Sequence, residues 1–119
     1  MKVAVVGSRG FENKALLYKI LDNLRSHYNA FDQFDLIISG GAVGVDKLAE
    51  QYASERQIET KIFLPDYVKH LRGAPIRRNA LIVEAADLIV AFWDGKSKGT
   101  GNTLKTAVKY KRPFGHITI

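Results

Sequence analysis

Short apolar runs alternate with amphipathic stretches along the whole chain. The runs cover Val3–Val6, Leu36–Ile38, Thr60–Leu64, Leu88–Phe92 and Phe114–Ile119, and glycine-bearing segments follow the first, second and fourth of them. The continuous apolar runs Val3–Val6 and Leu36–Ile38 are typical of strands that are buried on both faces of a parallel sheet. The pattern therefore predicts a strand at each run, with Val3–Val6 at the centre of the sheet.

Helical periodicity fills most of the stretches between these runs. A first helix is expected over about residues 13–29, from the spacing of Leu17, Ile20, Leu21, Leu24 and Tyr28. A second helix presents one face that carries Val45, Leu48, Ala49, Tyr52 and Ala53. After a looser stretch over Asp66–Ala74, Pro75 is placed to open a third helix that ends near Ala86, because proline is favoured at the first helical position. A short fourth helix is expected over about residues 101–111.

Alternation of strands and helices predicts the fold class. Such a chain forms a parallel sheet with helices on both faces, because right-handed crossovers carry each helix over the sheet. We expect an α/β, Rossmann-like three-layer sandwich with a five-stranded parallel sheet in the order 3-2-1-4-5. The length of 119 residues fits a single domain over residues 1–119.

Three glycine-bearing loops follow strands whose carboxyl ends meet at one edge of this sheet. The loops read Gly7-Ser8-Arg9-Gly10, then Ser39-Gly40-Gly41-Ala42-Val43-Gly44, and then Trp93-Asp94-Gly95-Lys96-Ser97-Lys98-Gly99-Thr100-Gly101. Ligands of open α/β sheets bind at this edge, where the strand order reverses. Glycines allow close approach to the backbone, and helix N-termini supply free N–H groups that favour phosphate. The loops therefore predict a phosphate-binding site, although each glycine also serves a tight turn.

Five further residues near this edge have two interpretations each. Asp46 either orients loop amides or contacts a ribose hydroxyl, and an acidic residue is also favoured there by the helix dipole. Arg78 and Asn79 begin the third helix and face either the ligand or solvent. Trp93 either stacks on a base or packs at the strand end. Asp94 is either a general base or a turn-forming residue.

Composition removes several other kinds of site. The chain has no cysteine, which excludes disulfides and thiolate chemistry, and its three histidines share no metal-ligand spacing. The loops fit neither G-x-G-x-x-G nor GxxxxGK[ST], so the sequence predicts neither an NAD enzyme nor an ATPase. A net charge of +6 favours anionic partners. The N-terminal apolar run is too short for a signal peptide or membrane span, so a cytoplasmic location is expected.

Taken together, these segments resemble the SLOG superfamily, and within it the YspA/YpsA-related (YAcAr) branch. The matching segments are the first two loops extended to Asp46, then Gly73–Asn79, and then Ala86–Thr100. The resemblance implies a Rossmann-like fold and a site for nucleotides or nucleotide-derived signals. Some relatives are phosphoribohydrolases that carry Pro-Gly-Gly-x-Gly-Thr-x-x-Glu with a catalytic glutamate, whereas others bind single-stranded DNA, as DNA-processing protein A does. Here Gly99-Thr100 matches the Gly-Thr pair, but Thr103 occupies the glutamate position, which leaves enzymatic activity open.

The sequence thus predicts a binding or sensor domain for a phosphate-containing, nucleotide-derived small molecule whose identity is open. The alternatives are a nucleotide hydrolase that uses Asp94 or Asp46 as its base, and a single-stranded nucleic-acid binder. No metal and no membrane partner are expected, and a homo-oligomer is left open. The candidate ligand-binding residues are Gly7, Ser8, Arg9, Ser39, Gly40, Gly41, Ala42, Gly44, Asp46, Arg78, Asn79, Trp93, Asp94, Gly95, Ser97, Gly99, Thr100 and Gly101.

Overall fold

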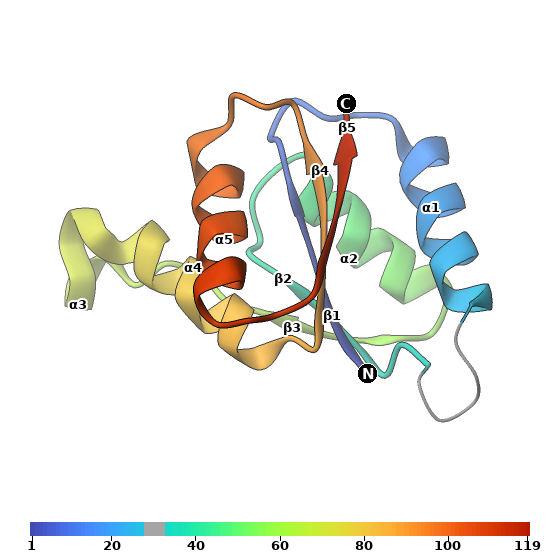
Figure 1. Cartoon of the computed structure of the whole chain (residues 1–119), viewed down its shortest axis with the longest axis horizontal. Helices are drawn as coiled ribbons and strands as arrows, with labels where there is room; N and C mark the ends of the chain where they lie inside the picture. The colour runs from blue at the N-terminus through green and yellow to red at the C-terminus, as the bar shows by residue number, and fades with distance from the viewer. Residues whose placement is uncertain (28–32) are drawn as a thin grey trace.

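The computed structural model describes residues 1–27 and 33–119. Its elements follow one another as β1 (Lys2–Gly7), α1 (Lys14–Ser26), β2 (Leu36–Ser39), α2 (Val45–Glu55), β3 (Glu59–Ile62), α3 (Tyr67–His70), the 3₁₀ turn η1 (Leu71–Gly73), α4 (Ala74–Ala85), β4 (Leu88–Trp93), α5 (Lys98–Lys109) and β5 (Phe114–Thr118) (Figure 1).

The strands form one parallel sheet in the order β3-β2-β1-β4-β5. Helices α1 and α2 cover one face of this sheet and α4 and α5 cover the other, while α3 projects away from it (Figure 1). The predicted α/β, Rossmann-like sandwich and its strand order are therefore confirmed. Because the order reverses between β1 and β4, the loops after these two strands flank the switch point at the carboxyl edge of the sheet.

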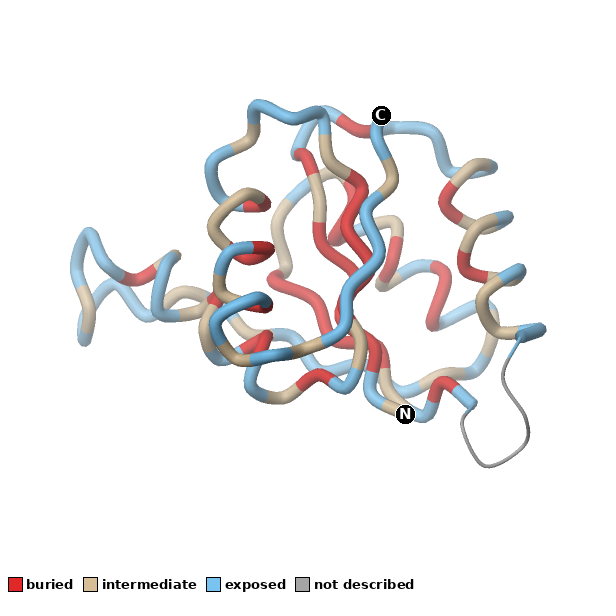
Figure 2. Tube along the Cα trace, in the orientation of Figure 1, coloured by how far each residue is buried: buried red, intermediate tan, exposed pale blue. Residues whose placement is uncertain are grey.

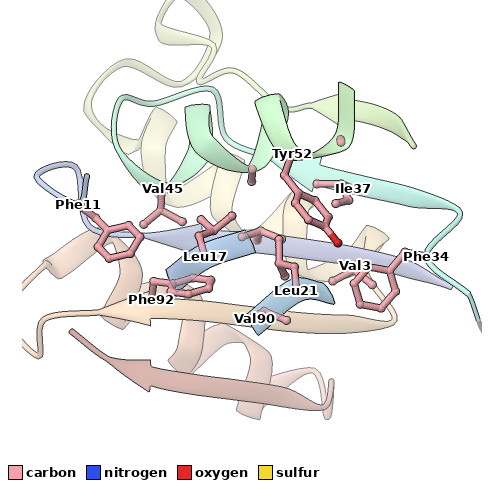
Figure 3. Packing of buried hydrophobic residues seen from close by; sticks show 13 residues of the cluster. Val3, Phe11, Leu17, Leu21, Phe34, Ile37, Val45, Tyr52, Val90 and Phe92 are labelled. Carbon is pink, nitrogen blue, oxygen red and sulfur yellow. The ribbon is translucent and has the colours of Figure 1, made fainter. Parts of the chain in front are cut away.

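The central strand separates two cores by the ordinary alternation of a strand. Val3 and Val5 pack with α1 and α2, whereas Ala4 and Val6 pack with α4 and α5. Figure 2 shows that the buried residues of α1, α2, α4 and α5 lie on the sides of these helices that face the sheet. In the first core, Phe11 from the β1–α1 loop stacks on a β4 phenylalanine with ring centroids 5.5 Å apart (Figure 3). This contact anchors the loop after β1 at the edge where the candidate site lies.

Three boundaries differ from the sequence prediction. Residues 67–73 form the short helix α3 and the turn η1 in place of a loose stretch. Helix α1 ends at Ser26, and Tyr28, which the predicted helix included, lies outside the described residues. Helix α5 begins at Lys98 because the Asp94 carboxylate accepts the N–H groups of residues 96 and 97, each at 2.8 Å, and so closes the preceding loop early. Gly99 and Thr100 consequently lie inside the first turn of this helix, not before it.

Across the described residues, none of the helices combines the length and the apolar character needed to cross a bilayer.

Candidate functional site

The three glycine-bearing loops meet around one cavity of about 310 Å³ at the carboxyl edge of the sheet. Its lining comes from the end of β1, from the loops after β1, β2 and β4, and from helices α2, α4 and α5. The lining residues are Val6, Gly7, Arg9, Gly40, Ala42, Asp46, Pro75, Arg78, Asn79, Ile82, Ser97, Gly99, Thr100 and Thr103. This volume lies at the lower end of the roughly 300–1,000 Å³ found for small-molecule sites.

Two glycines allow the loops after β1 and β2 to approach each other this closely. A Cβ atom on Gly7 would lie 2.4 Å from the carbonyl oxygen of Phe92 and 2.6 Å from a methyl carbon of Val45. Gly44 has a φ of +81°, and a Cβ there would lie 2.4 Å from the carbonyl oxygen of Arg9. Any side chain at either position would push the β1 loop away from the start of α2, so these glycines shape the cavity from behind.

The loop after β2 is held by side chains of the helix that follows it. The Asp46 carboxylate accepts the N–H of Ala42 at 3.1 Å. Behind it, the Ser39 hydroxyl accepts the N–H of Gly41 at 3.1 Å and donates to Glu50 at 2.8 Å. Asp46 therefore does orient loop amides, which is one of the two roles that the sequence suggested.

Burial raises the pKa of the Asp46 carboxyl to about 6, against the opposing effects of the Ala42 N–H and the Arg78 guanidinium. Asp46 is 7% exposed, and part of that exposure is to the cavity that it lines. A group with this pKa is largely ionised at neutral pH and becomes protonated in mildly acidic solution.

Arg78 is committed to backbone carbonyls. Its Nη1 donates to the Gly40 oxygen at 2.6 Å and to the Phe63 oxygen at 3.4 Å, and its Nε donates to the side-chain oxygen of Asn79 at 3.0 Å. Burial lowers the pKa of Arg78 from its ordinary value, while the Asp46 carboxylate opposes that shift. The guanidinium thus fastens α4 to the loops after β2 and β3, with its charge balanced by Asp46.

Arg9 has the opposite character. Its side chain is exposed, it reaches the same cavity, and within the described residues it forms no hydrogen bond or ion pair. Its guanidinium fork is therefore free to pair with an anion that enters the cavity.

The first turn of α5 supplies uncommitted donors on the other side. Thr100 is 5% exposed, lines the cavity, and has a hydroxyl without a hydrogen bond in the described part of the chain. The first four N–H groups of a helix have no partner within the helix, and they carry partial positive charge. Next to them, the Gly99 carbonyl is already taken, because it accepts from Thr103 Oγ1 at 3.1 Å and from Asn79 Nδ2 at 3.4 Å.

Several predicted residues lie near the cavity without lining it. Trp93 donates its Nε1–H to the Ser97 oxygen at 2.9 Å and its ring lies 5.3 Å from that of His116, so it packs beside α5. The Asp94 carboxylate accepts loop amides, and these hydrogen bonds lower its pKa. The predicted residues outside the lining are Ser8, Ser39, Gly41, Gly44, Trp93, Asp94, Gly95 and Gly101.

Four lining residues were absent from the predicted set, namely Val6, Pro75, Ile82 and Thr103. Helical spacing could have indicated two of them, since Ile82 and Thr103 each follow a predicted residue by three positions. Over residues 1–27 and 33–119, no three His, Asp or Glu side chains gather in a group able to hold a metal ion.

Known proteins similar to this chain were compared with it by sequence and by fold. The model of the YspA, cpYpsA-related SLOG family (YAcAr) matches residues 1–70, which include the loops after β1 and β2. No curated protein matches the chain significantly.

Three solved structures share the fold. DNA processing protein A (DprA) from Streptococcus pneumoniae matches with a TM-score of 0.79 and 21% identity, over 99% of this chain and 50% of its own. DprA from Helicobacter pylori, described with a single-stranded DNA binding mode, matches with a TM-score of 0.73 and 22% identity, over 98% of this chain and 64% of its own. TM1055 matches with a TM-score of 0.68 and 24% identity, over 95% of this chain and 71% of its own.

The chain thus spans about half the length of the S. pneumoniae protein, and at these identities the likeness concerns the fold. The family match is independent of that likeness and covers more than half of the chain, from β1 to the end of α3. The chain belongs to the YspA, cpYpsA-related SLOG family, YAcAr.

Proposed function

We propose that this chain binds a nucleotide or nucleotide-derived ligand whose terminal phosphate enters the cavity at the switch point. The observation that carries the proposal is that two groups able to bind an anion line the same cavity. One is Arg9, a cation with no partner in the described chain, and the other is the first turn of α5, whose N–H groups have no partner within the helix. A guanidinium fork and a helix N-terminus each bind phosphate well.

The charges in the cavity favour one orientation of such a ligand. The Arg78 guanidinium donates to backbone carbonyls, and its positive charge is balanced by the Asp46 carboxylate. The β2 side of the cavity therefore has little net positive charge. A phosphate is therefore best placed toward Arg9 and Thr100. The Asp46 carboxylate then accepts a hydrogen bond from a sugar hydroxyl, the second role that the sequence suggested. The cavity of about 310 Å³ leaves room for the sugar beside the phosphate.

The class of ligand is supported by two further considerations. The net charge of +6 favours polyanionic or phosphorylated partners. Similar folds occur in proteins that handle nucleic acid, since H. pylori DprA binds single-stranded DNA. Both considerations support a ligand of the nucleotide class and do not specify how many nucleotides it contains.

Thermal unfolding with a panel of mononucleotides tests the proposal. A ligand present at 100 times its Kd stabilises the folded chain by about 2.7 kcal/mol, which is readily measured. Arg9→Gln should lose that stabilisation, whereas Arg77→Gln, an equal change of charge on an exposed residue outside the cavity, should keep it. Equal stabilisation of the parent and of Arg9→Gln would overturn the phosphate assignment.

Hydrolysis of the nucleotide is a second candidate, favoured by one observation. Asp46 is the carboxyl group among the cavity-lining residues, and its pKa of about 6 suits a general base. Against this, the carboxylate already accepts the Ala42 N–H. Incubation of the purified chain with the same nucleotides, followed by chromatography, separates the two candidates: unchanged nucleotides favour binding, and product that disappears in Asp46→Asn favours hydrolysis.

A further inference from the structure

A second hollow, of about 570 Å³, lies between α5 and the edge strand β5. We call it the α5 groove. Its floor is apolar and includes Leu104, Val108 and Phe114. Among the described residues, Ser97 alone lines both this groove and the proposed phosphate cavity, so the two are separate surfaces of the chain.

Strand β5 leaves one row of backbone hydrogen-bonding groups without a partner. It is the last strand of the sheet and pairs with β4 on one side. The Ile119 N–H donates to the Trp93 oxygen at 3.1 Å, and the alternation of a strand then turns the odd-numbered positions of β5 toward β4. The N–H and C=O groups of Phe114, His116 and Thr118 therefore face the open edge, and no other described residue pairs with them.

This open edge lacks the usual protection against pairing with another chain. Natural edge strands commonly carry charged residues or proline, which discourage the addition of a further strand. The other edge strand, β3, follows that rule with Glu59 and Lys61, whereas β5 reads Phe-Gly-His-Ile-Thr and has no lysine, arginine, aspartate, glutamate or proline. The β5 edge is therefore suited to accept an added strand.

The residues that face the open edge also face the α5 groove. Phe114 and His116 line it, and Phe114 is 42% exposed. A strand added beside β5 would place alternate side chains over the same groove. Trp93, which pairs in register with Thr118, lies four strand positions from Phe114, or about 13 Å. The floor thus has the length of an extended peptide and is too long for one flat ring.

The rim of the α5 groove is basic. None of its lining side chains is acidic, and among the described residues the ammonium groups of Lys96, Lys98 and Lys105 form no ion pair. Lys98 and Lys105 are two turns of α5 apart, or about 10 Å. Three free cations favour an acidic partner. They oppose the pairing of β5 with a second copy of this chain, because that pairing would bring two such rims together.

We propose that β5 and the α5 groove bind an extended acidic segment of another protein, which adds a strand to the sheet. The backbone of that segment pairs with the outward groups of Phe114, His116 and Thr118. Its apolar side chains cover the floor of the groove, and its carboxylates pair with the rim lysines. In this mode of recognition, main-chain hydrogen bonds supply affinity and side-chain contacts supply specificity.

A synthetic peptide, acetyl-Thr-Glu-Thr-Val-Thr-Glu-Thr-amide, is the probe. In an extended peptide its glutamates and valine share one face, with the two glutamates about 13 Å apart. Trp93 is the single tryptophan of the sequence and lines the groove, so titration should change its fluorescence. Lys105→Gln should weaken binding by about 1.4- to 5-fold, as expected for one exposed ion pair. Lys109→Gln, on the same helix but outside the groove, is the matched control and should leave binding unchanged.

Two N-methylated forms of the peptide test the strand pairing itself. One carries methyl groups on the amides of the glutamates and valine, and the other carries them on the amides of three threonines. Only one of these two sets of N–H groups can face β5, so one form should lose at least about 10-fold in affinity and the other should bind as the parent peptide does. Loss in both forms, or in neither, would contradict strand addition.

The remaining outcomes identify other occupants of the groove. If the peptide leaves Trp93 emission unchanged and ignores Lys105→Gln, the assignment is overturned. If a single-stranded oligothymidylate displaces the peptide and binds more tightly, the groove is a nucleic-acid site and the inference is wrong. If sedimentation finds a dimer and the peptide binds only the monomer, the edge belongs to a second copy, and the inference is again wrong. Arg9→Gln should bind the peptide as the parent does, which keeps this test independent of the phosphate cavity.

Discussion

Replacing Thr100 with glutamate tests the phosphate cavity most sharply, because it acts on the ligand and hardly on the fold. Thr100 is the third residue of α5, where the helix dipole favours an acidic side chain by up to about 1 kcal/mol at an exposed site, and Thr100 itself is 5% exposed beside the cavity. The additional atoms have room, since Thr100 lines the cavity. We therefore expect Thr100→Glu to unfold within about 1 kcal/mol of the parent.

Ligand binding should respond far more strongly. Two unit negative charges about 4 Å apart repel each other by about 4 kcal/mol at an effective dielectric constant near 20. Since 1.4 kcal/mol is a tenfold change, the affinity for a nucleotide monophosphate should fall by roughly three orders of magnitude. Calorimetric titration measures that loss, and thermal unfolding without ligand checks the fold.

Thr100→Gln is the matched control, because it has nearly the same size as glutamate without the charge. It should lose much less affinity than Thr100→Glu, and the difference between the two variants isolates electrostatic repulsion from steric obstruction. If Thr100→Glu bound the nucleotide as tightly as the parent, the first turn of α5 would be only a turn, and the phosphate would have to lie elsewhere. If both variants lost affinity equally, bulk and not charge would explain the loss.

Three other substitutions follow from the same geometry. Gly99→Ala should raise the free energy of unfolding by about 0.5 kcal/mol, because alanine is the better helix former and its Cβ meets no atom within 4 Å. The same substitution should weaken ligand binding, because the methyl group narrows the cavity. Urea denaturation measures the first effect and calorimetric titration the second. The raised pKa of Asp46 means that the folded chain binds more protons than the unfolded chain between about pH 4 and 6, so this group makes the fold less stable as the pH rises through that window, by up to about 3 kcal/mol. Asp46→Asn should remove this contribution, so its stability relative to the parent should be greater at pH 7 than at pH 4.5, and an equal difference at both pH values would contradict it. Thr103→Glu restores the acidic position of the phosphoribohydrolase pattern but should produce no nucleotide cleavage, which chromatography checks. It should also lower the melting temperature, because Thr103 is 2% exposed and its hydroxyl donates to the Gly99 oxygen, which a carboxylate cannot do. Thermal unfolding measures that change.

The three central strands, β1, β2 and β4, could be predicted because each has a local apolar pattern in the sequence. Runs such as Val3–Val6 and Leu88–Phe92 are apolar on both faces, as a parallel strand between two helix layers requires. Helix α3 and the turn η1 could not be predicted in this way. Val68 in α3 is 94% exposed and Leu71 in η1 is 71% exposed, so no buried face imposes a periodic pattern on this segment. The early start of α5 depends on the two hydrogen bonds that the Asp94 side chain accepts, which composition alone does not reveal.

The same distinction between local sequence and distant contacts applies to the candidate cavity. Its position follows from strand order and from glycines that come directly after the strands in the sequence, so the loops could be identified in advance. The roles of individual side chains depend on partners from other strands. Arg9 and Arg78 look equivalent in the sequence as cations near one sheet edge, but only Arg78 meets the carbonyl oxygens of Gly40 and Phe63, which the pairing of β2 with β3 brings together.

In the phosphate site that we propose, the two arginines have different roles. Arg78, bound to two carbonyls and balanced by Asp46, keeps the β2 loop in shape and adds little net attraction for an anion. Arg9, exposed and unpaired in the described chain, supplies the attraction without supporting the fold. In such a site the residues that keep the loops rigid are different from those that contact the ligand. The loops hold their conformation without ligand, so little of the binding free energy from the contacts with Arg9 and α5 is lost to ordering the backbone.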